Sequence, residues 1–390
     1  DTESDNLAIG HEAMTTNTAG GQYYLAIGNY ALDALTSGDE NVAIGWGAMG
    51  ALTTGSSNTA MGAAALGGAA VTGNFNTAIG HNAMDANTSG YSNTAVGKDA
   101  LGANTTGADN TAVGQGALLV NTTGDTNVAI GHDALLANTT ANQNIAIGVA
   151  ALAANTTGAR NIAIGHSALD GCDTETDNIA IGFEAMTTNN AGGTDNIAIG
   201  TYALDALTSG DFNVAIGKNA MTDATTALRN VAIGRETLAN LTIGHDNIAI
   251  GQQAIQTATE GLYNVGVGYY ALQALTTGDY NMAYGNEAGV VITEGVQNVL
   301  MGGFAGREIT TGDNNICLGY NTGRTGTPGG EITTGDNTLR IGDQNIANSH
   351  VQVDWTVASD KRDKTDVKPA KMGLDFVNKL EPVTYHWDKR

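Results

Sequence analysis

The segment "VASDKRDKTDVKPAKMGLDF", residues 357–376, holds the side chains best suited to chemistry. It places a hydroxyl, Ser359, five residues before an amine, Lys364, in a basic stretch. A lysine serves as a general base when burial or a nearby positive charge lowers its pKa, and Arg362 is a candidate for that neighbour. The alternative is that "SDKRDK" is only a solvated loop. Elsewhere no Ser-His-Asp set, HExxH motif, phosphate loop or carboxylate pair stands out from the repeats.

Charge separates this segment from the body of the chain. Residues 359–390 hold 6 acidic and 8 basic side chains, whereas residues 1–358 hold 33 and 8. This asymmetry indicates a boundary near residue 358. Because an acidic body is repelled by phosphate, we expect no nucleic-acid partner. No run of about 18 apolar residues occurs, so we expect no insertion into a membrane.

The composition predicts a fold built around small side chains. Glycine accounts for 54 of 390 residues and proline for 3, while 42% of the residues are hydrophobic. This excludes collagen and argues against simple disorder. Cys172 and Cys317 lie far apart and predict neither a disulfide framework nor a zinc site. The first residues match the internal "DTETDNIAIG", so we expect the natural protein to have a further N-terminal part.

One short motif, Asn-x-Ala-Ile-Gly with small variations, occurs in twenty copies. Fifteen of the spacings are 17 residues, three are 18 and the last is 23. In the unit "NVAIGHDALLANTTANQ", the alternation predicts a short strand with Val128 and Ile130 on one face. Ala134 and Leu135 form a second apolar anchor, and "NTTANQ" is a turn. Such a repeat must be considered before any other signal.

A single 17-residue unit has no interior, but stacked units can bury their apolar residues. We therefore predict a β-solenoid in which each strand pairs with the same strand of the next coil, giving a rod roughly 95 Å long. A core of one Ile, one other branched residue, one Leu or Met and two Ala per coil is thin, which favours assembly with identical copies. We expect a homotrimer, although the sequence argues for oligomerisation more firmly than for the number three.

Three recurring polar groups have competing interpretations. "NTT" and "NTS" runs are formal glycosylation sites, but an Asn at a fixed turn position suits turn chemistry better. Asp125 and Asp313 in "TGD" turns could hold calcium, yet they lack the dense spacing of calcium loops and are expected to be solvated. Histidines directly after the motif glycine are expected to be exposed turn residues, and we predict no metal or other cofactor. The Asn and His residues concerned are Asn87, Asn104, Asn121, Asn138, Asn155, His11, His81, His132 and His166.

The repeat resembles two known families over residues 1–342. Its "NTAIG" strand resembles the coils of trimeric autotransporter adhesin heads, and the "NTAIG…AL…NTTG" unit resembles more closely the repeats of phage tail fibres. The autotransporter repeat is shorter, so the second half of each coil need not share its conformation. The resemblance implies an all-β, parallel, homotrimeric solenoid rod.

The C-terminal residues resemble the start of the endosialidase-type intramolecular chaperone of phage tailspikes and tail fibres. The residues that match the family pattern are Ser359, Asp360, Arg362, Lys364, Pro382, Val383, Tyr385 and Trp387. The resemblance implies that this domain assembles three chains and then cuts itself off at the Ala358–Ser359 bond. Ser359 would be the nucleophile and Lys364 the base, supported by Asp360 and Arg362. The family domain continues beyond Arg390, so the chaperone is not complete in this sequence.

These inferences divide the chain into a repeat shaft (1–342), a closing strand or linker (343–358) and the start of a small α/β chaperone domain (359–390), with a helix expected over 370–380. The predicted function is a structural, receptor-binding fibre of a phage tail. It would bind a host surface glycan or protein, and other tail proteins through the missing N-terminal part. The alternatives are a bacterial trimeric adhesin or extracellular filament at the cell surface, and a glycan-degrading enzyme, which would need acid pairs that break the repeat.

Overall fold

The computed structural model describes residues 5–16, 21–68, 70–327 and 329–347. The chain divides into two units, Asp1–Asn345 and Ile346–Arg390. The boundaries at 342 and 358 stay predictions. The closing strand over 351–358 and the helix and strand expected after residue 359 lie outside the described residues.

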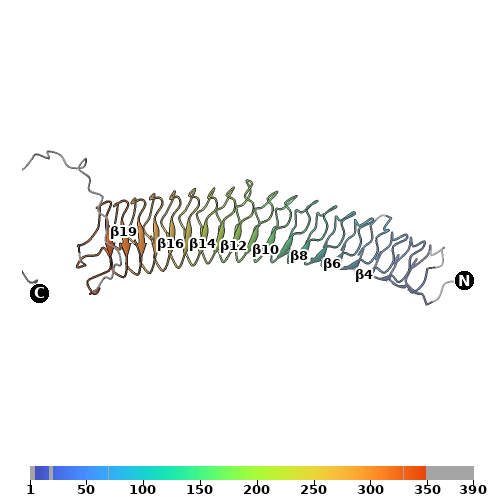
Figure 1. Cartoon of the computed structure of the whole chain (residues 1–390). Helices are drawn as coiled ribbons and strands as arrows, with labels where there is room; N and C mark the ends of the chain where they lie inside the picture. The colour runs from blue at the N-terminus through green and yellow to red at the C-terminus, as the bar shows by residue number, and fades with distance from the viewer. Residues whose placement is uncertain (1–4, 17–20, 69, 328, 348–390) are drawn as a thin grey trace, which may run out of the picture. The chain divides into compact units, whose positions relative to one another are not determined.

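The first unit is a stack of short coils, each of which contributes one three-residue strand. Figure 1 shows these strands side by side along one side of an elongated, gently curved rod. The strands are β1 (Leu7–Ile9), β2 (Leu25–Ile27), β3 (Val42–Ile44), β4 (Thr59–Met61), β5 (Thr77–Ile79), β6 (Thr94–Val96), β7 (Thr111–Val113), β8 (Val128–Ile130), β9 (Ile145–Ile147), β10 (Ile162–Ile164), β11 (Ile179–Ile181), β12 (Ile197–Ile199), β13 (Val214–Ile216), β14 (Val231–Ile233), β15 (Ile248–Ile250), β16 (Val265–Val267), β17 (Met282–Tyr284), β18 (Val299–Met301), β19 (Ile316–Leu318) and β20 (Leu339–Ile341).

All twenty strands belong to one parallel sheet in which each strand pairs with the next along the chain. The pairing has no offset, so Ala129 lies opposite Ala146 and Ile130 opposite Ile147. The described residues contain no helix. The predicted all-β solenoid of 17-residue coils is therefore confirmed.

The core differs from the predicted one. In the coil of β8, Ala129, Ala134 and Leu135 are completely buried, whereas Val128 is only half-buried and Ile130 is 38% exposed. The prediction that the Ile and the second branched residue form the core is wrong. Because side chains alternate across a strand, the middle Ala points inward and its two larger neighbours point outward. Most coils bury this middle Ala, a second Ala and one Leu or Met, and some coils bury one more large side chain, such as Leu35 or Leu207.

Tight corners close each coil. Gly131 has a φ of 141°, and Asp133 and Leu135 follow with φ values of 57° and 52°. A Cβ on Gly131 would lie 2.3 Å from the carbonyl oxygen of Gly148 in the next coil. Glycine recurs at this position because it accepts this φ and leaves space for the neighbouring coil.

A buried ladder of asparagines precedes the strands. The Asn144 N–H donates to Asn127 Oδ1 at 3.0 Å, its Nδ2 donates to the Gly158 carbonyl at 2.8 Å, and its Oδ1 accepts from the Asn161 N–H at 2.9 Å. Asn144 is 0% exposed. Each such side chain therefore satisfies backbone groups of the coils on both sides.

A second asparagine ladder runs through the turns at Asn87, Asn104, Asn121, Asn138 and Asn155. Each Nδ2 after the first donates to the Oδ1 of the preceding ladder residue at 2.8–3.1 Å. All five are 0% exposed. The turn interpretation of these residues is confirmed, because the folded rod hides their amide nitrogens from a glycosyltransferase.

The second ladder stops at Cys172, which occupies the next ladder position. Asn155 Oδ1, which would accept from an asparagine at this position, is buried without a hydrogen-bond partner among the described residues. The Cys172 thiol instead lies 3.6 Å from the Glu175 carbonyl. Burial raises the pKa of this thiol well above its ordinary value, so it stays protonated.

Cys172→Asn is expected to stabilise the rod. The new Nδ2 would reach Asn155 Oδ1, and its Oδ1 could accept from Asn189 Nδ2. Satisfying buried polar groups in this way is worth about 1–3 kcal/mol. Amide hydrogen exchange of residues 155–190 should slow, while Cys172→Ala, the control, should not slow it. Faster exchange in Cys172→Asn would contradict the ladder interpretation.

The turn aspartates have a structural role that the sequence did not reveal. Asp125 Oδ1 accepts the Ala108 N–H at 2.7 Å, and Asp313 Oδ1 accepts the Val296 N–H at 2.8 Å. Asp125 is exposed, as expected, and Asp313 is partly exposed, but each carboxylate also caps a backbone donor of the preceding coil.

Candidate functional site

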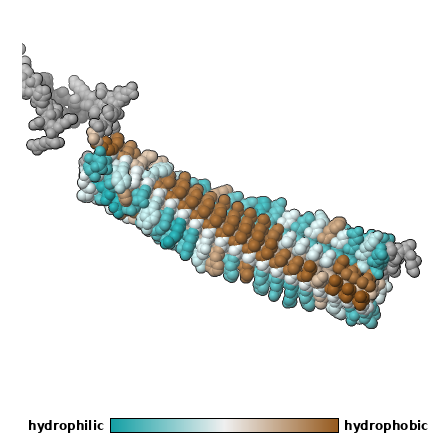
Figure 2. All heavy atoms as spheres, turned by 90° about the horizontal axis from the view of Figure 1, so that it is seen from below, coloured by the Kyte–Doolittle hydropathy of each residue, from teal (hydrophilic) through white to brown (hydrophobic). Residues whose placement is uncertain are grey.

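The outer side of the sheet is the most extensive candidate surface. The first and third residues of β1–β20 point away from the coil interior, and we call this surface the apolar face. In sixteen strands both residues are apolar, and β4–β7 differ in having Thr first. Figure 2 shows the face as a brown band that runs along the rod.

The apolar face is exposed in the single chain. Ile130, Ile233 and Ile250 are 36–38% exposed, and Leu7 and Ile341, at the two ends, are 50% and 59% exposed. Parallel sheets are normally covered on both faces, and long exposed apolar patches mark interaction sites. The arrangement can therefore bind another apolar surface of similar length.

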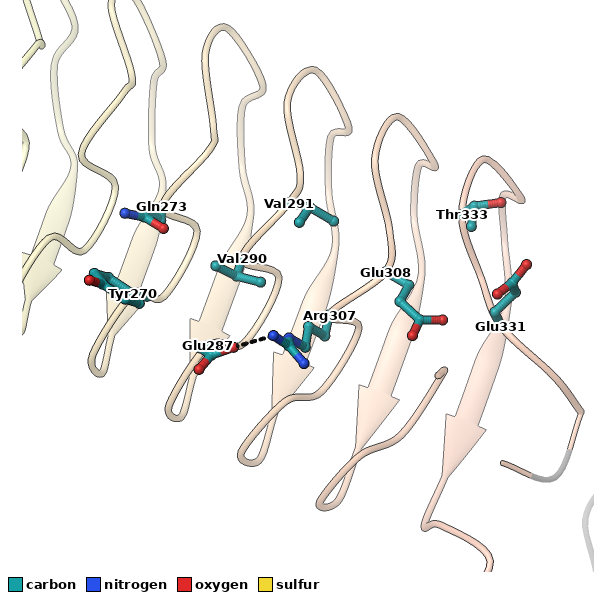
Figure 3. Close-up of a pocket in the computed structure, with 9 residues that line it drawn as sticks. All are labelled: Tyr270, Gln273, Glu287, Val290, Val291, Arg307, Glu308, Glu331 and Thr333. Atoms are coloured by element: carbon teal, nitrogen blue, oxygen red, sulfur yellow. Dashed lines mark ion pairs between the residues drawn. The ribbon is translucent and has the colours of Figure 1, made fainter. Parts of the chain in front are cut away.

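A groove near the C-terminal end of the rod is a second candidate. It has a volume of about 690 Å³ and is lined by residues of successive coils (Figure 3). Val290 and Val291 supply apolar surface, and Tyr270 lies at one end. The other lining residues are polar or charged: Gln273, Glu287, Arg307, Glu308, Glu331 and Thr333.

Ion pairs and hydrogen bonds between coils hold the charged groups of the groove. Arg307 pairs with Glu287 at 2.9 Å, and Figure 3 shows the two side chains directed toward each other. The Thr325 hydroxyl lies 2.8 Å from Glu308 Oε2 and 2.6 Å from Glu331 Oε2. Burial acts to raise the pKa of Glu308, but hydrogen bonds from the Thr325 N–H and hydroxyl outweigh it, so this pKa lies below its usual value. The groove therefore carries negative charge at neutral pH.

Aromatic contacts position the arginines beside this groove. The guanidinium carbons of Arg307 and Arg324 lie 5.4 Å and 5.6 Å from the centre of the Phe304 ring. Tyr320 contacts the same ring edge-on at 5.6 Å. Sequence reasoning missed these groove residues. The signal that could have found them is the pair of charged variants "REIT" and "GEIT", which replace the "ALTTG"-like turn in the last coils.

The residues predicted for self-cleavage, Ser359, Asp360, Arg362 and Lys364, and the bond after Ala358, lie outside the described residues. Their geometry stays a prediction.

The other site predictions concern the rod. His11, His81, His132 and His166 are exposed, as expected for turn residues. Within the described ranges, no group of three or more His, Cys, Asp or Glu side chains could hold a metal ion. The same part of the chain has no helix long and apolar enough to cross a membrane.

Comparison with known proteins gives one family match. Residues 359–390 match the model of the Peptidase S74 family, described as the chaperone of endosialidase. This match implies an autoproteolytic intramolecular chaperone at the C-terminal end of the chain. No curated protein and no solved structure matches the chain. A long parallel β-solenoid of repeating coils, followed in sequence by a segment similar to the chaperone of endosialidase, is consistent with a phage tail fibre.

Proposed function

We propose that this chain is the shaft of a phage tail fibre that attaches the virion to its host, assembled as a homotrimer by a C-terminal self-cleaving chaperone. The observation that carries the proposal is the apolar face, which runs along the twenty-stranded sheet and which no described residue covers. A mechanical rod needs such a surface for assembly rather than for catalysis.

Identical copies are the simplest cover for this surface. A parallel copy presents an apolar face of the same length, whereas a globular partner would cover only a few coils. The outer face has two side chains from each of twenty strands, and burying about 20 Å² of each would reach the roughly 800 Å² per partner of a standard interface. Three copies around one axis would leave each narrow face buried and each polar turn in water.

The C-terminal segment supports maturation by self-cleavage. In this proposal Ser359 Oγ attacks the carbonyl carbon of Ala358 while Lys364 takes the hydroxyl proton. The bond between the Ala358 carbonyl carbon and the Ser359 nitrogen then breaks, Lys364 passes the proton to that nitrogen, and water hydrolyses the resulting ester to free the Ala358 carboxylate. Asp360 and Arg362 would support the pair, the latter by keeping the lysine neutral. The family match over residues 359–390 is the support for this step.

Host attachment would use exposed surface of the trimer, and the groove between Tyr270 and Thr333 is a candidate contact for a surface glycan or protein. The rod would join other tail proteins, with the virion tail as its location. A bacterial surface adhesin or filament is the alternative. A membrane anchor encoded in the same gene would favour that alternative, and a baseplate-attachment segment would oppose it.

The proposed cleavage is tested by comparing the chain, produced from its full gene, with the variant Ser359→Ala. The wild type is expected to lose everything after Ala358 and to run as an SDS-resistant trimer, whereas the variant should keep its full mass. Intact mass spectrometry and size-exclusion light scattering measure both outcomes. If both proteins remain full length and trimeric, the shaft stands but Ser359 is not a nucleophile. If both proteins are monomers, the proposed homotrimer is wrong.

The apolar face is tested by Ile130→Asp. Ile130 is 38% exposed in one chain, so a carboxylate there should disturb a monomer little. In a trimer it would bury a charge from each chain at one level, and an unpaired buried charge costs several kcal/mol. Light scattering should show monomers or local separation of the chains. Thr123→Asp, at an exposed turn of the preceding coil, is the matched control and should stay trimeric.

A further inference from the structure

The apolar face contains one polar block. The first residue is apolar in sixteen strands, but it is Thr in the four consecutive strands β4–β7. These threonines, Thr59, Thr77, Thr94 and Thr111, are paired in series along the sheet, and Val42 and Val128 flank them at the two ends. They form one uninterrupted row of hydroxyls within an otherwise apolar surface.

These hydroxyls face away from the coil interior. All four threonines are half-buried and alternate with completely buried alanines, which places them on the outer face. Among the described residues, none of the four hydroxyls makes a hydrogen bond. The threonines of the turns contrast with them, because hydroxyls such as those of Thr105 and Thr122 donate to the carbonyl of the next coil at 2.9 Å and 3.0 Å.

A repeated face lacks a natural register. If one chain slides along another by one coil, about 4.8 Å, almost every apolar side chain meets an equivalent neighbour again. Only the contacts of the end coil are lost. A trimer of such rods therefore needs a feature that distinguishes one level from the next, as a single buried polar residue does in coiled coils.

We propose that Thr59, Thr77, Thr94 and Thr111 fix the axial register of the assembled chains. The partner is a second and third copy of this chain, parallel and unshifted, and the inference rests on the proposed homotrimer. In this register each threonine meets the same threonine of the other copies, so that every hydroxyl can both donate and accept. A shift by one coil places Thr59 of one chain level with Val42 of another, and Val128 level with Thr111.

The shift is unfavourable because a hydroxyl in a dry interface loses its hydrogen bonds to water and gains none in return. Each mismatched level should therefore reduce the shifted population about tenfold or more, since 1.4 kcal/mol corresponds to a factor of ten. A shift by four coils would mismatch the whole block.

Disulfide trapping reads the register directly. Two differently tagged chains are co-expressed, one carrying Ile147→Cys and the other Ile164→Cys, which are level with each other only after a shift of one coil. The natural cysteines, Cys172 and Cys317, are buried in the core and do not interfere. Each tag identifies one cysteine variant. We count the disulfides that join two chains with the same tag, here called equal tags, and those that join two chains with different tags, called unequal tags.

With the natural threonine block, disulfides between unequal tags should be at least about tenfold rarer than disulfides between equal tags. When all four threonines are changed to Val, a replacement of the same shape, both kinds should form to a similar extent. The matched control changes four exposed turn residues of consecutive coils to Val: Thr106, Thr123, Thr140 and Thr157. It should leave the register unchanged.

A second design moves the block. Thr59→Val and Val128→Thr in the Ile164→Cys chain shift its hydroxyl row by one coil, from β4–β7 to β5–β8. Mixed assemblies with the natural block on the Ile147→Cys chain should then give mainly disulfides between unequal tags.

The proposal is overturned if the four-valine chain stays in register and the moved block does not redirect the disulfides. Light scattering of the same samples separates this result from a failure of the proposed function. Trimers with an unchanged register reject the threonine block alone, whereas monomers reject the homotrimer and the block with it.

Discussion

Gly148→Ala is expected to break the rod in the middle. Gly148 has a φ of 140°, and a Cβ there would lie 2.3 Å from the Gly165 carbonyl oxygen of the next coil. The backbone conformation alone costs about 1–3 kcal/mol for a residue with a side chain. With the clash against backbone, which has no room to move between stacked coils, we expect a total above about 4 kcal/mol.

The measurement is thermal unfolding followed by circular dichroism, together with amide hydrogen exchange. Because each coil contacts only its neighbours, the defect should uncouple the two halves of the rod and give two transitions. Protection should fall first in β9 and β10. Gly47→Ala is the control, since a Cβ there meets nothing within 4 Å at a φ of 63°, and Ala150 already occupies the equivalent position at 54°. A variant Gly148→Ala as stable as this control would contradict the close contact between coils.

Asn144→Asp is expected to destabilise the rod by about 3–5 kcal/mol at neutral pH, because it places an uncompensated charge in a buried network. The Asn144 Nδ2 that donates to the Gly158 carbonyl becomes an oxygen, so that two acceptors face each other at a contact of 2.8 Å. The bond from the Asn161 N–H can persist, since the remaining oxygen still accepts it.

The loss of folding stability in Asn144→Asp should depend on pH. Burial and the facing carbonyl favour the protonated carboxyl, so its pKa in the folded rod lies above the unfolded value of about 3.9. The folded state then binds more protons than the unfolded state, and stability falls as pH rises between these two pKa values. Denaturation at pH 4 and pH 7 measures this difference.

Asn142→Asp in the same coil is the control. Its exposed side chain accepts the Asp125 N–H at 2.6 Å, a role that a carboxylate can fill. Equal losses in the two variants, independent of pH, would refute the buried ladder.

The strands could be predicted from the sequence because the repeat constrains them strongly. A motif that returns every 17 residues with the same alternation can satisfy its backbone only by pairing with itself, so the parallel pairing without offset followed directly. The structure confirms this parallel pairing, for example between Ala129 and Ala146.

The orientation of the strands could not be predicted in the same way. A three-residue strand has one middle residue and two outer residues, and alternation alone does not say which set points inward. Large apolar residues are usually expected to point into the core, yet Ala129 points inward and Ile130 points outward. The width of the coil decides this, and the width follows from how closely the corners approach each other.

Local sequence was also insufficient for polar groups that act between coils. Asp125 looks solvated within its own turn, and only the stacked coil shows that its carboxylate accepts the Ala108 N–H. Cys172 looks like an ordinary small residue, and only the ladder shows the acceptor on Asn155 that it leaves unpaired. The charged groove near Arg307 likewise combines residues of several coils.

The sequence by itself determined the coil length, the strand positions, the strand pairing and the change from acidic to basic composition near residue 358. Each of these is a property of spacing or charge along the chain. Only the tertiary structure decided which side chains form the core, which form the apolar face and which polar groups complete the ladders. These depend on distances between coils 17 residues apart, where the narrow interior takes the middle residue of each strand, usually alanine, and leaves its branched neighbours outside.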